Sequence, residues 1–284
     1  MISNIEILFG LANRCKKYGI KNTRSYSNLA CLTKFFEICD GVDGAEAYGW
    51  DPNDLKILKK YKKSINYTKI DIFQFNNDEL RKLLQKHSFE NNKTYLKGIY
   101  IHNKVNENII KKYKSICSFI RDELKVKIGF SVYEQKEIDL ILKHDLVCDI
   151  IQIPYNLNVN LDFKKLKNLK CDIYLRSIFL QGVYFANLRY KFSKPIVNKI
   201  NLQKEYLLSR ALNYNFDIGQ YLFSNALSFC QENQFKGVVI GSSSFERVRN
   251  YVINHKFVEI NDKNSLKRFD IIDDYLADPR KWKI

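Results

Sequence analysis

The stretch Asp149-Ile150-Ile151-Gln152-Ile153-Pro154-Tyr155 is apolar at nearly every position rather than at alternate ones. A strand with this composition is buried on both faces, which is typical of a parallel sheet covered by helices. The run Gly237-Val238-Val239-Ile240 has the same character much later in the chain. The two runs predict an α/β fold in which a helix follows each parallel strand.

Strand-like and helix-like segments alternate on both sides of this stretch. We expect strands at residues 5–10, 41–48, 69–75, 95–102, 126–132, 149–155, 171–179 and 236–241. We expect helices at residues 27–39, 51–61, 78–86, 106–121, 134–143, 162–167, 204–213, 220–230 and 245–255, which include one extra helix before the last strand. Eight units in 284 residues predict a single-domain (β/α)8 TIM barrel over residues 1–284. A doubly wound open sheet is the alternative, but the G-x-G-x-x-G turn that favours it is absent.

Composition narrows the function classes. The seven cysteines include no C-x-x-C pair, so we expect reduced thiols rather than a zinc site or a disulfide framework. No apolar run approaches the roughly 20 residues that span a bilayer, and no signal peptide is recognisable, so we expect a cytoplasmic protein. The net charge of +16 is compatible with binding of nucleic acid or of phosphate-bearing ligands. The preferred explanation is compositional, because the lysines are scattered along the chain, mostly on polar faces of amphipathic segments.

Chemistry in a barrel of this kind is expected at the carboxyl ends of the strands. This rule selects residues 43–48, Phe73, His102, and residues 131–133, 152–156, 176–179 and 241–244.

Several of these segments together resemble the aldo-keto reductases. The segment Asp43-Gly44-Ala45-Glu46-Ala47-Tyr48-Gly49 is similar to the family motif D-T-A-x-x-Y-G, with Gly44 in place of threonine. Similar family segments follow in order: Gly10-Leu11-Ala12 with Tyr18-Gly19-Ile20, Ile101-His102-Asn103, Gly129-Phe130-Ser131-Val132-Tyr133, Gln152-Ile153-Pro154-Tyr155-Asn156, Arg176-Ser177-Ile178-Phe179-Leu180-Gln181-Gly182, and Val239-Ile240-Gly241-Ser242-Ser243-Ser244 with Arg247. The resemblance covers residues 5–255, and it implies reduction of a carbonyl group by NADPH.

The resemblance also implies roles for individual residues. Tyr48 would be the general acid, His102 would orient the carbonyl, and Asp43 would polarise the network behind them. The cofactor-binding residues implied by the motifs are Ser131, Gln152, Arg176, Gly241, Ser242, Ser243 and Arg247. Of these, Gly241 to Ser243 would meet a phosphate at the start of a helix, and Arg247 could hold a 2′-phosphate. No metal is implied.

Each assignment has a structural alternative. Tyr48 is one of 18 tyrosines and could simply pack in a core. His102 has three other histidines as rivals, although its position at a strand end favours function. Gln152 could fill the barrel interior, and Arg247 could be a solvated helix residue.

One family position is expected to differ. Aligning residues 69–73 with the third strand of the family places Phe73 where the catalytic lysine belongs. Lys69 lies four residues earlier, about 13 Å down a strand at ~3.3 Å per residue, so it is expected at the wrong end of the barrel. Asp43 would then be a buried carboxylate without its partner, at a cost of about 3–5 kcal/mol unless another cation reaches it. Lys104, Arg14 and Arg176 are the candidates.

The leading hypothesis is an NADPH-dependent oxidoreductase. The strand-seven segment resembles family members of bacterial surface-sugar pathways, so a sugar or nucleotide-sugar carbonyl is the expected substrate. The alternative is a catalytically silent barrel that binds a nucleotide or a protein partner. A nucleic-acid-binding protein ranks third, because no aromatic and basic recognition motif is present.

Overall fold

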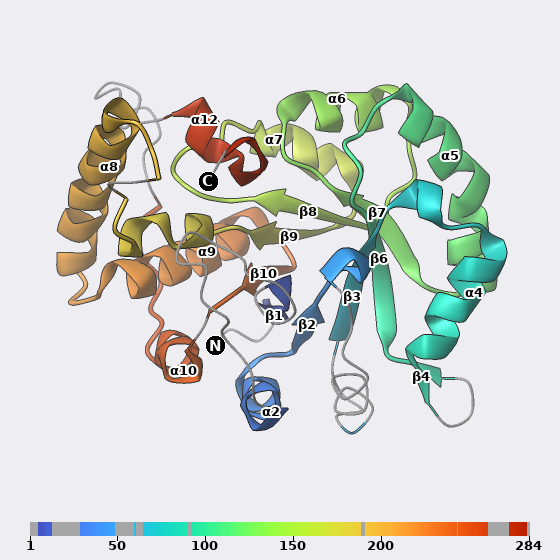
Figure 1. Ribbon diagram of the computed structural model, residues 1–284, viewed down its shortest axis with the longest axis horizontal. Helices are drawn as coiled ribbons and strands as arrows, with labels where there is room; N and C mark the ends of the chain where they lie inside the picture. Colours follow the sequence, from blue (N-terminus) through green and yellow to red (C-terminus); the bar gives the residue numbers. More distant parts are fainter. Residues whose placement is uncertain are drawn as a thin grey trace.

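A closed parallel barrel forms the centre of the computed structural model, which describes residues 5–12, 29–48, 60, 65–89, 93–188, 191–242, 244–260 and 273–282. Its strands neighbour one another in the order β1-β10-β9-β8-β7-β6-β3-β2. Helices lie outside the barrel, with α4, α5 and α6 on one side and α8, α9 and α10 on the other (Figure 1). The predicted (β/α)8 barrel is therefore confirmed.

The barrel strands are short and mostly end earlier than the sequence pattern suggests. Their bounds are β1 Glu6–Gly10, β2 Gly41–Asp43, β3 Ile65–Ile70, β6 Leu96–Ile101, β7 Lys127–Ser131, β8 Ile150–Pro154, β9 Asp172–Arg176 and β10 Gly237–Ile240. A small antiparallel hairpin, β4 (Ser88–Phe89) and β5 (Lys93–Thr94), lies outside the barrel. The largest deviation is at β3. This strand begins at Ile65 and ends at Ile70, whereas the expected strand covers residues 69–75.

Helices follow most strands, as expected. Their bounds are α2 Leu29–Ile38, α4 Asn77–Lys86, α5 Glu107–Ser118, α6 Gln135–Lys143, α7 Phe163–Leu166, α8 Lys194–Leu212, α9 Ile218–Asn233, α10 Phe245–Ile253 and α12 Asp274–Ala277. Shorter helical turns are η1 Glu46–Tyr48, η2 Ile72–Gln74, η4 Phe119–Glu123, η5 Lys167–Leu169, η6 Leu180–Phe185 and η7 Pro279–Lys281. The helix expected at residues 51–61 lies outside the described residues, apart from Lys60.

Inward-facing side chains close the barrel at its amino end. Tyr67, Tyr100 and Tyr174 form a buried cluster with Leu8, Ile150 and Val239. The Tyr67 and Tyr174 hydroxyls are 2.9 Å apart, and the Tyr174 hydroxyl donates to Glu6 at 2.7 Å. A Cβ atom at Gly98 would come within 2.6 Å of the Tyr67 ring, so glycine at this position makes room for the tyrosine. The barrel interior is therefore filled by side chains at this end.

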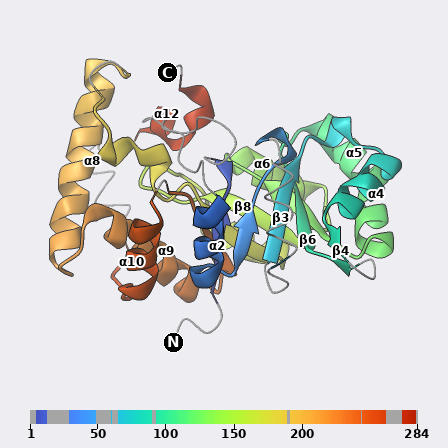
Figure 2. The same ribbon diagram turned by 60° about the horizontal axis from the view of Figure 1, so that its bottom comes forward.

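Helix α8 begins ten residues before the expected start at 204 and lies at the outer edge of the molecule (Figures 1 and 2). A second apolar cluster joins α8 to α9, to the segment after β9 and to the C-terminal turns, through Leu180, Tyr184, Leu207, Tyr221, Leu276 and Trp282 among others. Asn158 and Gln203 exchange side-chain hydrogen bonds of 3.3 and 2.6 Å in this region. The backbone N–H of Asp273 also donates to Asn158, at 2.9 Å. These contacts hold α12 and η7 near the carboxyl ends of the strands.

Candidate active site

A buried ion pair lies at the carboxyl ends of β2 and β3. The carboxylate of Asp43, the last residue of β2, accepts from the Lys69 ammonium, and each residue is only 4% exposed. The other Asp43 oxygen accepts a hydrogen bond from the Gln152 amide at 3.0 Å. Burial lowers the pKa of Lys69 below its ordinary value, and Arg176 lowers it further, whereas Asp43 opposes both. The aspartate is therefore neither solvated nor without a partner.

This pair corrects the expectations that Lys69 lies at the wrong end of the barrel and that Asp43 lacks a partner. Strand β3 ends at Ile70, so Lys69 is its second-to-last residue and lies at the polar end of the barrel. Asp71 ends the strand because its side chain accepts from the Phe73 N–H and caps the turn η2. The Phe73 side chain lies beyond the strand and is 60% exposed, so it fills no pocket. The expected strand was placed four residues too late, because Ile70, Ile72 and Phe73 resemble a continuing apolar run.

Tyr48 and His102 face each other at the same end of the barrel. Tyr48 lies in the turn η1 rather than in a strand, and its ring meets the His102 imidazole edge to face at 6.5 Å between centroids. The His102 N–H donates to the Ile70 carbonyl at 2.8 Å, which ties the loop after β6 to the end of β3. Asn103 extends this link because it accepts from the Ile72 N–H at 2.8 Å. Asp43, Tyr48, His102 and Lys69 are thus brought to one end of the barrel.

Two buried polar atoms beside the ion pair lack hydrogen-bond partners among the described residues. Ser131 ends β7, is 2% exposed and has an unpaired Oγ, while Gln152 is fully buried and has an unpaired Oε1. The two residues are register neighbours on β7 and β8. Because an unsatisfied buried polar atom carries a free-energy cost, such atoms at a strand end indicate where a polar ligand binds. A primary carboxamide, with donors and an acceptor, fits them.

Arg176 ends β9 as a buried cation whose hydrogen-bond partners among the described residues are neutral. Its guanidinium donates to the Val132 carbonyl at 2.9 Å and to the Ser177 hydroxyl at 3.2 Å. It also stacks on the Tyr133 ring, 3.6 Å from the centroid. Its Nε is buried without a partner in the described part of the chain. Ser177 has a left-handed φ of 57°, a strained conformation that recurs at ligand sites.

The predicted phosphate-binding segment follows β10. Gly241 is exposed and Ser242 is 8% exposed, whereas Ser243 lies outside the described residues. Ser244 caps α10, since its side chain accepts from the Arg247 N–H at 3.3 Å. Arg247 is exposed in the first turn of this nine-residue helix. Free N–H groups at a helix start, together with an exposed arginine, suit an anionic phosphate group.

Sequence reasoning missed the residue that organises the loops at the barrel mouth. Glu137 on α6 is fully buried and accepts from the Tyr133 and Glu134 N–H groups at 2.7 and 2.9 Å. Its second oxygen accepts from the Val105 N–H at 3.0 Å, which links the loop after β6 to the loop after β7. The sequence contains a signal for this role, because Glu134 and Glu137 have the spacing of a helix capping box. The structure contains this capping box at the start of α6.

The fold is shared with solved aldo-keto reductase structures. A glycerol dehydrogenase from Gluconobacter oxydans superposes with a TM-score of 0.65 at 12% identity, over 96% of this chain and 93% of that one. An aldo-keto reductase from Bacillus halodurans, in its holo form, gives 0.65 at 13% identity over 97% and 95%. An aldo-keto reductase of the silkworm Bombyx mori gives 0.65 at 14% identity over 98% and 87%. No protein-family model and no curated protein sequence matches the chain.

At these identities the likeness establishes a common fold along nearly the whole chain. The activity has to be argued from the residues of this site. Among the described residues, no helix combines the length and the apolar character that crossing a membrane requires.

Proposed function

We propose that this protein is a nicotinamide-dependent oxidoreductase of the aldo-keto reductase type, which reduces a carbonyl group with NADPH. The observation that carries the proposal is the buried Asp43–Lys69 pair at the barrel end that also holds Tyr48 and His102. Burying two charges carries a desolvation penalty that their attraction often fails to offset, so a buried ion pair is weak evidence for stability. Ionisable groups with shifted pKa values cluster at functional sites, so an ion pair buried at the strand ends favours a functional role. The shared fold agrees with the proposal.

Each site residue has a task in the reaction. The cofactor, when bound, supplies the hydride that converts the carbonyl carbon into an alcohol carbon. Tyr48 donates the proton to the carbonyl oxygen as negative charge develops there. His102 donates a hydrogen bond to the same oxygen and orients the carbonyl. The positive charge of Lys69 favours loss of the tyrosine proton, and Asp43 holds the ammonium in place.

The cofactor site rests on the chain's own unpaired polar atoms. Ser131 Oγ and Gln152 Oε1 would bind the carboxamide of the nicotinamide, which supplies the partners that these atoms lack among the described residues. Gly241, Ser242 and Ser243 would hold a phosphate of the adenosine half, and Arg247 a 2′-phosphate. Arg176 would add positive charge beside the nicotinamide end. We propose a small carbonyl compound, a sugar or a nucleotide sugar, as the substrate, and the cytoplasm as the location.

The silent-barrel alternative depended on a missing lysine. Because Lys69 pairs with Asp43, that premise no longer holds. The proposal is tested by titrating NADPH and following its fluorescence, and then by measuring turnover with aldehydes, sugars and nucleotide sugars. Saturable binding with turnover is expected. No binding at high micromolar NADPH would remove the proposal, and binding without any turnover would restore the silent barrel.

Replacing Ser131 by alanine should weaken NADPH binding without destabilising the free protein. In the free protein the buried Ser131 hydroxyl has no partner among the described residues, so its removal should leave the free energy of unfolding unchanged or slightly higher. In the complex one hydrogen bond is lost, about 0.5–1.5 kcal/mol, which raises the NADPH dissociation constant by about two- to tenfold. Fluorescence titration and chemical denaturation measure the two quantities. Ser115→Ala, an exposed hydroxyl change on α5, serves as the control.

Arg247 is expected to set the preference between the two nicotinamide cofactors. Arg247→Gln should raise the dissociation constant for NADPH by about tenfold or more, because a charged hydrogen bond to the 2′-phosphate is lost. Binding of NADH, which lacks this phosphate, should stay unchanged. Parallel titrations of the two cofactors measure the ratio. An equal loss for both cofactors would show that Arg247 acts elsewhere.

A further inference from the structure

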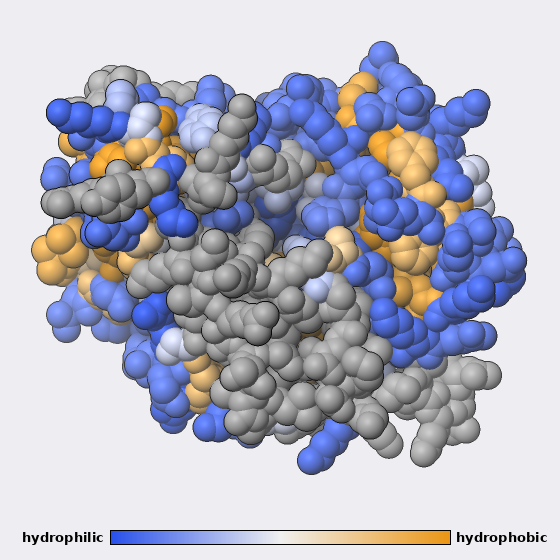
Figure 3. Space-filling model, viewed as in Figure 1, coloured by the Kyte–Doolittle hydropathy of each residue, from blue (hydrophilic) through white to orange (hydrophobic). Residues whose placement is uncertain are grey.

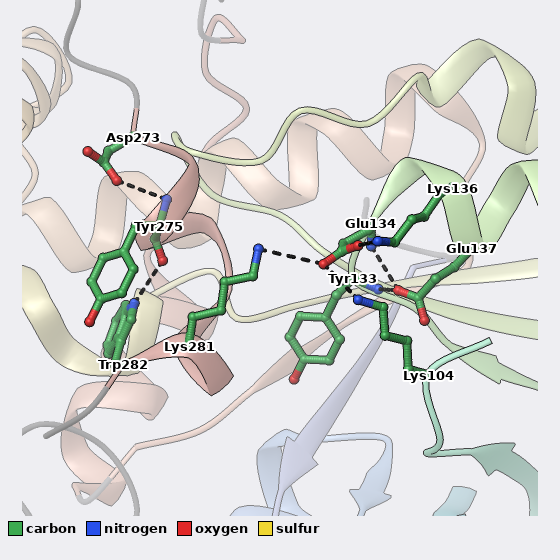
Figure 4. A network of polar contacts seen from close by, with 9 residues as sticks. All are labelled: Lys104, Tyr133, Glu134, Lys136, Glu137, Asp273, Tyr275, Lys281 and Trp282. Carbon is green, nitrogen blue, oxygen red and sulfur yellow. Dashed lines mark hydrogen bonds and ion pairs between the residues drawn. The ribbon is translucent and has the colours of Figure 1, made fainter. Parts of the chain in front are cut away.

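An unusual concentration of lysines surrounds one carboxylate at the barrel mouth. Glu134, which precedes α6, lies 3.1 Å from Lys104, 2.9 Å from Lys136 and 3.6 Å from Lys281. Lys104 follows β6, whereas Lys281 comes from the C-terminal turn η7 and reaches across the mouth to Glu134 (Figure 4). Lys136 and Lys104 lower the pKa of Glu134 to about 2, so Glu134 is ionised at any physiological pH. Three ammonium groups therefore contact the same carboxylate.

The neighbouring acids offset only part of this excess. Both carboxylate oxygens of Glu137 accept hydrogen bonds from the neutral backbone N–H groups of Val105, Tyr133 and Glu134. Glu134 raises the pKa of Lys136, and the negative charge of Glu137 adds to this effect. Asp273 caps α12 and pairs with Lys199 at 3.4 Å, and it points away from Lys281 in Figure 4. On the face drawn in Figure 3, most of the described surface is hydrophilic, with apolar patches towards the left and the right. The lysines are between 47 and 65% exposed, so an incoming ligand can reach them.

A further cation lies beneath the lysines. Tyr133 immediately precedes Glu134, and the Arg176 guanidinium stacks on its ring. Arg176 is only 7% exposed, and among the described residues no carboxylate pairs with it. Positive charge thus continues from the rim towards the Asp43–Lys69 pair. A ligand with a carbonyl group at one end and an anionic group at the other would satisfy both regions.

We propose that the substrate is a carbonyl compound carrying a phosphate group, and that Lys104 and Lys281 bind this phosphate at the mouth. The proposal rests on the proposed reductase function, and it selects phosphorylated sugars and nucleotide sugars over neutral ones. Binding would relieve the repulsion among the three ammonium groups and would hold η7 against the loop after β7. Phosphate is a strong multi-point acceptor, and lysine binds it as a point charge.

The test compares D-glyceraldehyde 3-phosphate with D-glyceraldehyde by calorimetric titration of the protein saturated with NADP⁺. The oxidised cofactor prevents carbonyl reduction and fills the cofactor's own phosphate site. The phosphorylated aldehyde is expected to bind about tenfold or more tightly, and this preference should fall as salt is raised. The double variant Lys104→Gln, Lys281→Gln should bring the ratio of the two dissociation constants close to one.

Two control variants isolate the charge effect. Lys127→Gln removes an ion-paired lysine at the opposite end of the barrel, where it contacts Asp172, and should keep the preference. Lys104→Arg with Lys281→Arg keeps the charges and should also retain it. A ratio near one in the wild type, or a preference that survives the double glutamine variant, would overturn the proposal. Turnover of both aldehydes with NADPH is measured separately, so failure of the reductase function is distinguished from failure of this inference.

Discussion

Replacing Lys69 by methionine is expected to lower turnover by at least about 100-fold and the free energy of unfolding by about 3–5 kcal/mol. The substitution leaves the Asp43 carboxylate buried, with the Gln152 amide as its remaining side-chain partner among the described residues. In the proposed mechanism it also removes the positive charge that would favour proton loss from Tyr48. Steady-state kinetics and chemical denaturation measure the two effects.

Three further variants separate the buried charge from a general packing defect. Adding Asp43→Asn to Lys69→Met should recover part of the lost stability, because the unpaired charge disappears, but it should not recover turnover. Lys236→Met breaks a half-exposed pair with Glu6 at the other barrel end and should change stability by less than about 1 kcal/mol. Phe73→Ala should leave turnover intact, since this side chain is largely exposed. Loss of turnover in Phe73→Ala, with Lys69→Met active, would reverse the assignment.

Replacing Tyr48 by phenylalanine is expected to reduce kcat by about 10²- to 10⁴-fold, because the substrate oxygen loses its proton donor. The ring and its edge-to-face contact with His102 are retained, so NADPH binding and stability should change little. Single-turnover oxidation of bound NADPH measures the rate of the chemical step.

Tyr113→Phe on α5 provides a matched control for this substitution. It removes a tyrosine hydroxyl that donates to the Val147 carbonyl at 2.6 Å, away from the site. Stability should drop by about 1 kcal/mol while kcat stays at the wild-type value. Unchanged kcat in Tyr48→Phe would show that another group supplies the proton.

The fold was predictable because its signals are local and repeated. Near-continuous apolar runs such as β8 indicate strands covered on both sides, and their alternation with amphipathic helices leads to a closed barrel. The ends of the strands were harder to predict from the sequence, because an apolar run does not show where hydrogen bonding to the next strand stops. At β3 this displaced the strand by four residues and put Phe73 in place of Lys69. The signals that correct it are the inward alternation of Tyr67 and Lys69 and the cap formed by Asp71.

The site was predictable only in the parts that follow strands directly. Asp43, Ser131 and Arg176 end strands and His102 follows one, whereas Gln152 lies in the middle of β8 and reaches Asp43 through its side chain. The lysine cluster could not be predicted from the sequence, because Lys104, Glu134 and Lys281 are far apart along the chain. They meet only when η7 packs on the second apolar cluster. The position of Ser243 lies outside the described residues, so its phosphate role stays a prediction.

Hydride transfer is the central claim, and isotope labelling tests it most directly. The protein is mixed with NADPH dideuterated at C4 of the nicotinamide and with a set of aldehydes, sugars, sugar phosphates and nucleotide sugars, and the products are examined by mass spectrometry. The proposed function predicts an alcohol that carries one deuterium on the former carbonyl carbon, together with consumption of one NADPH for each product formed. Saturable NADPH binding without deuterium in any product would contradict it.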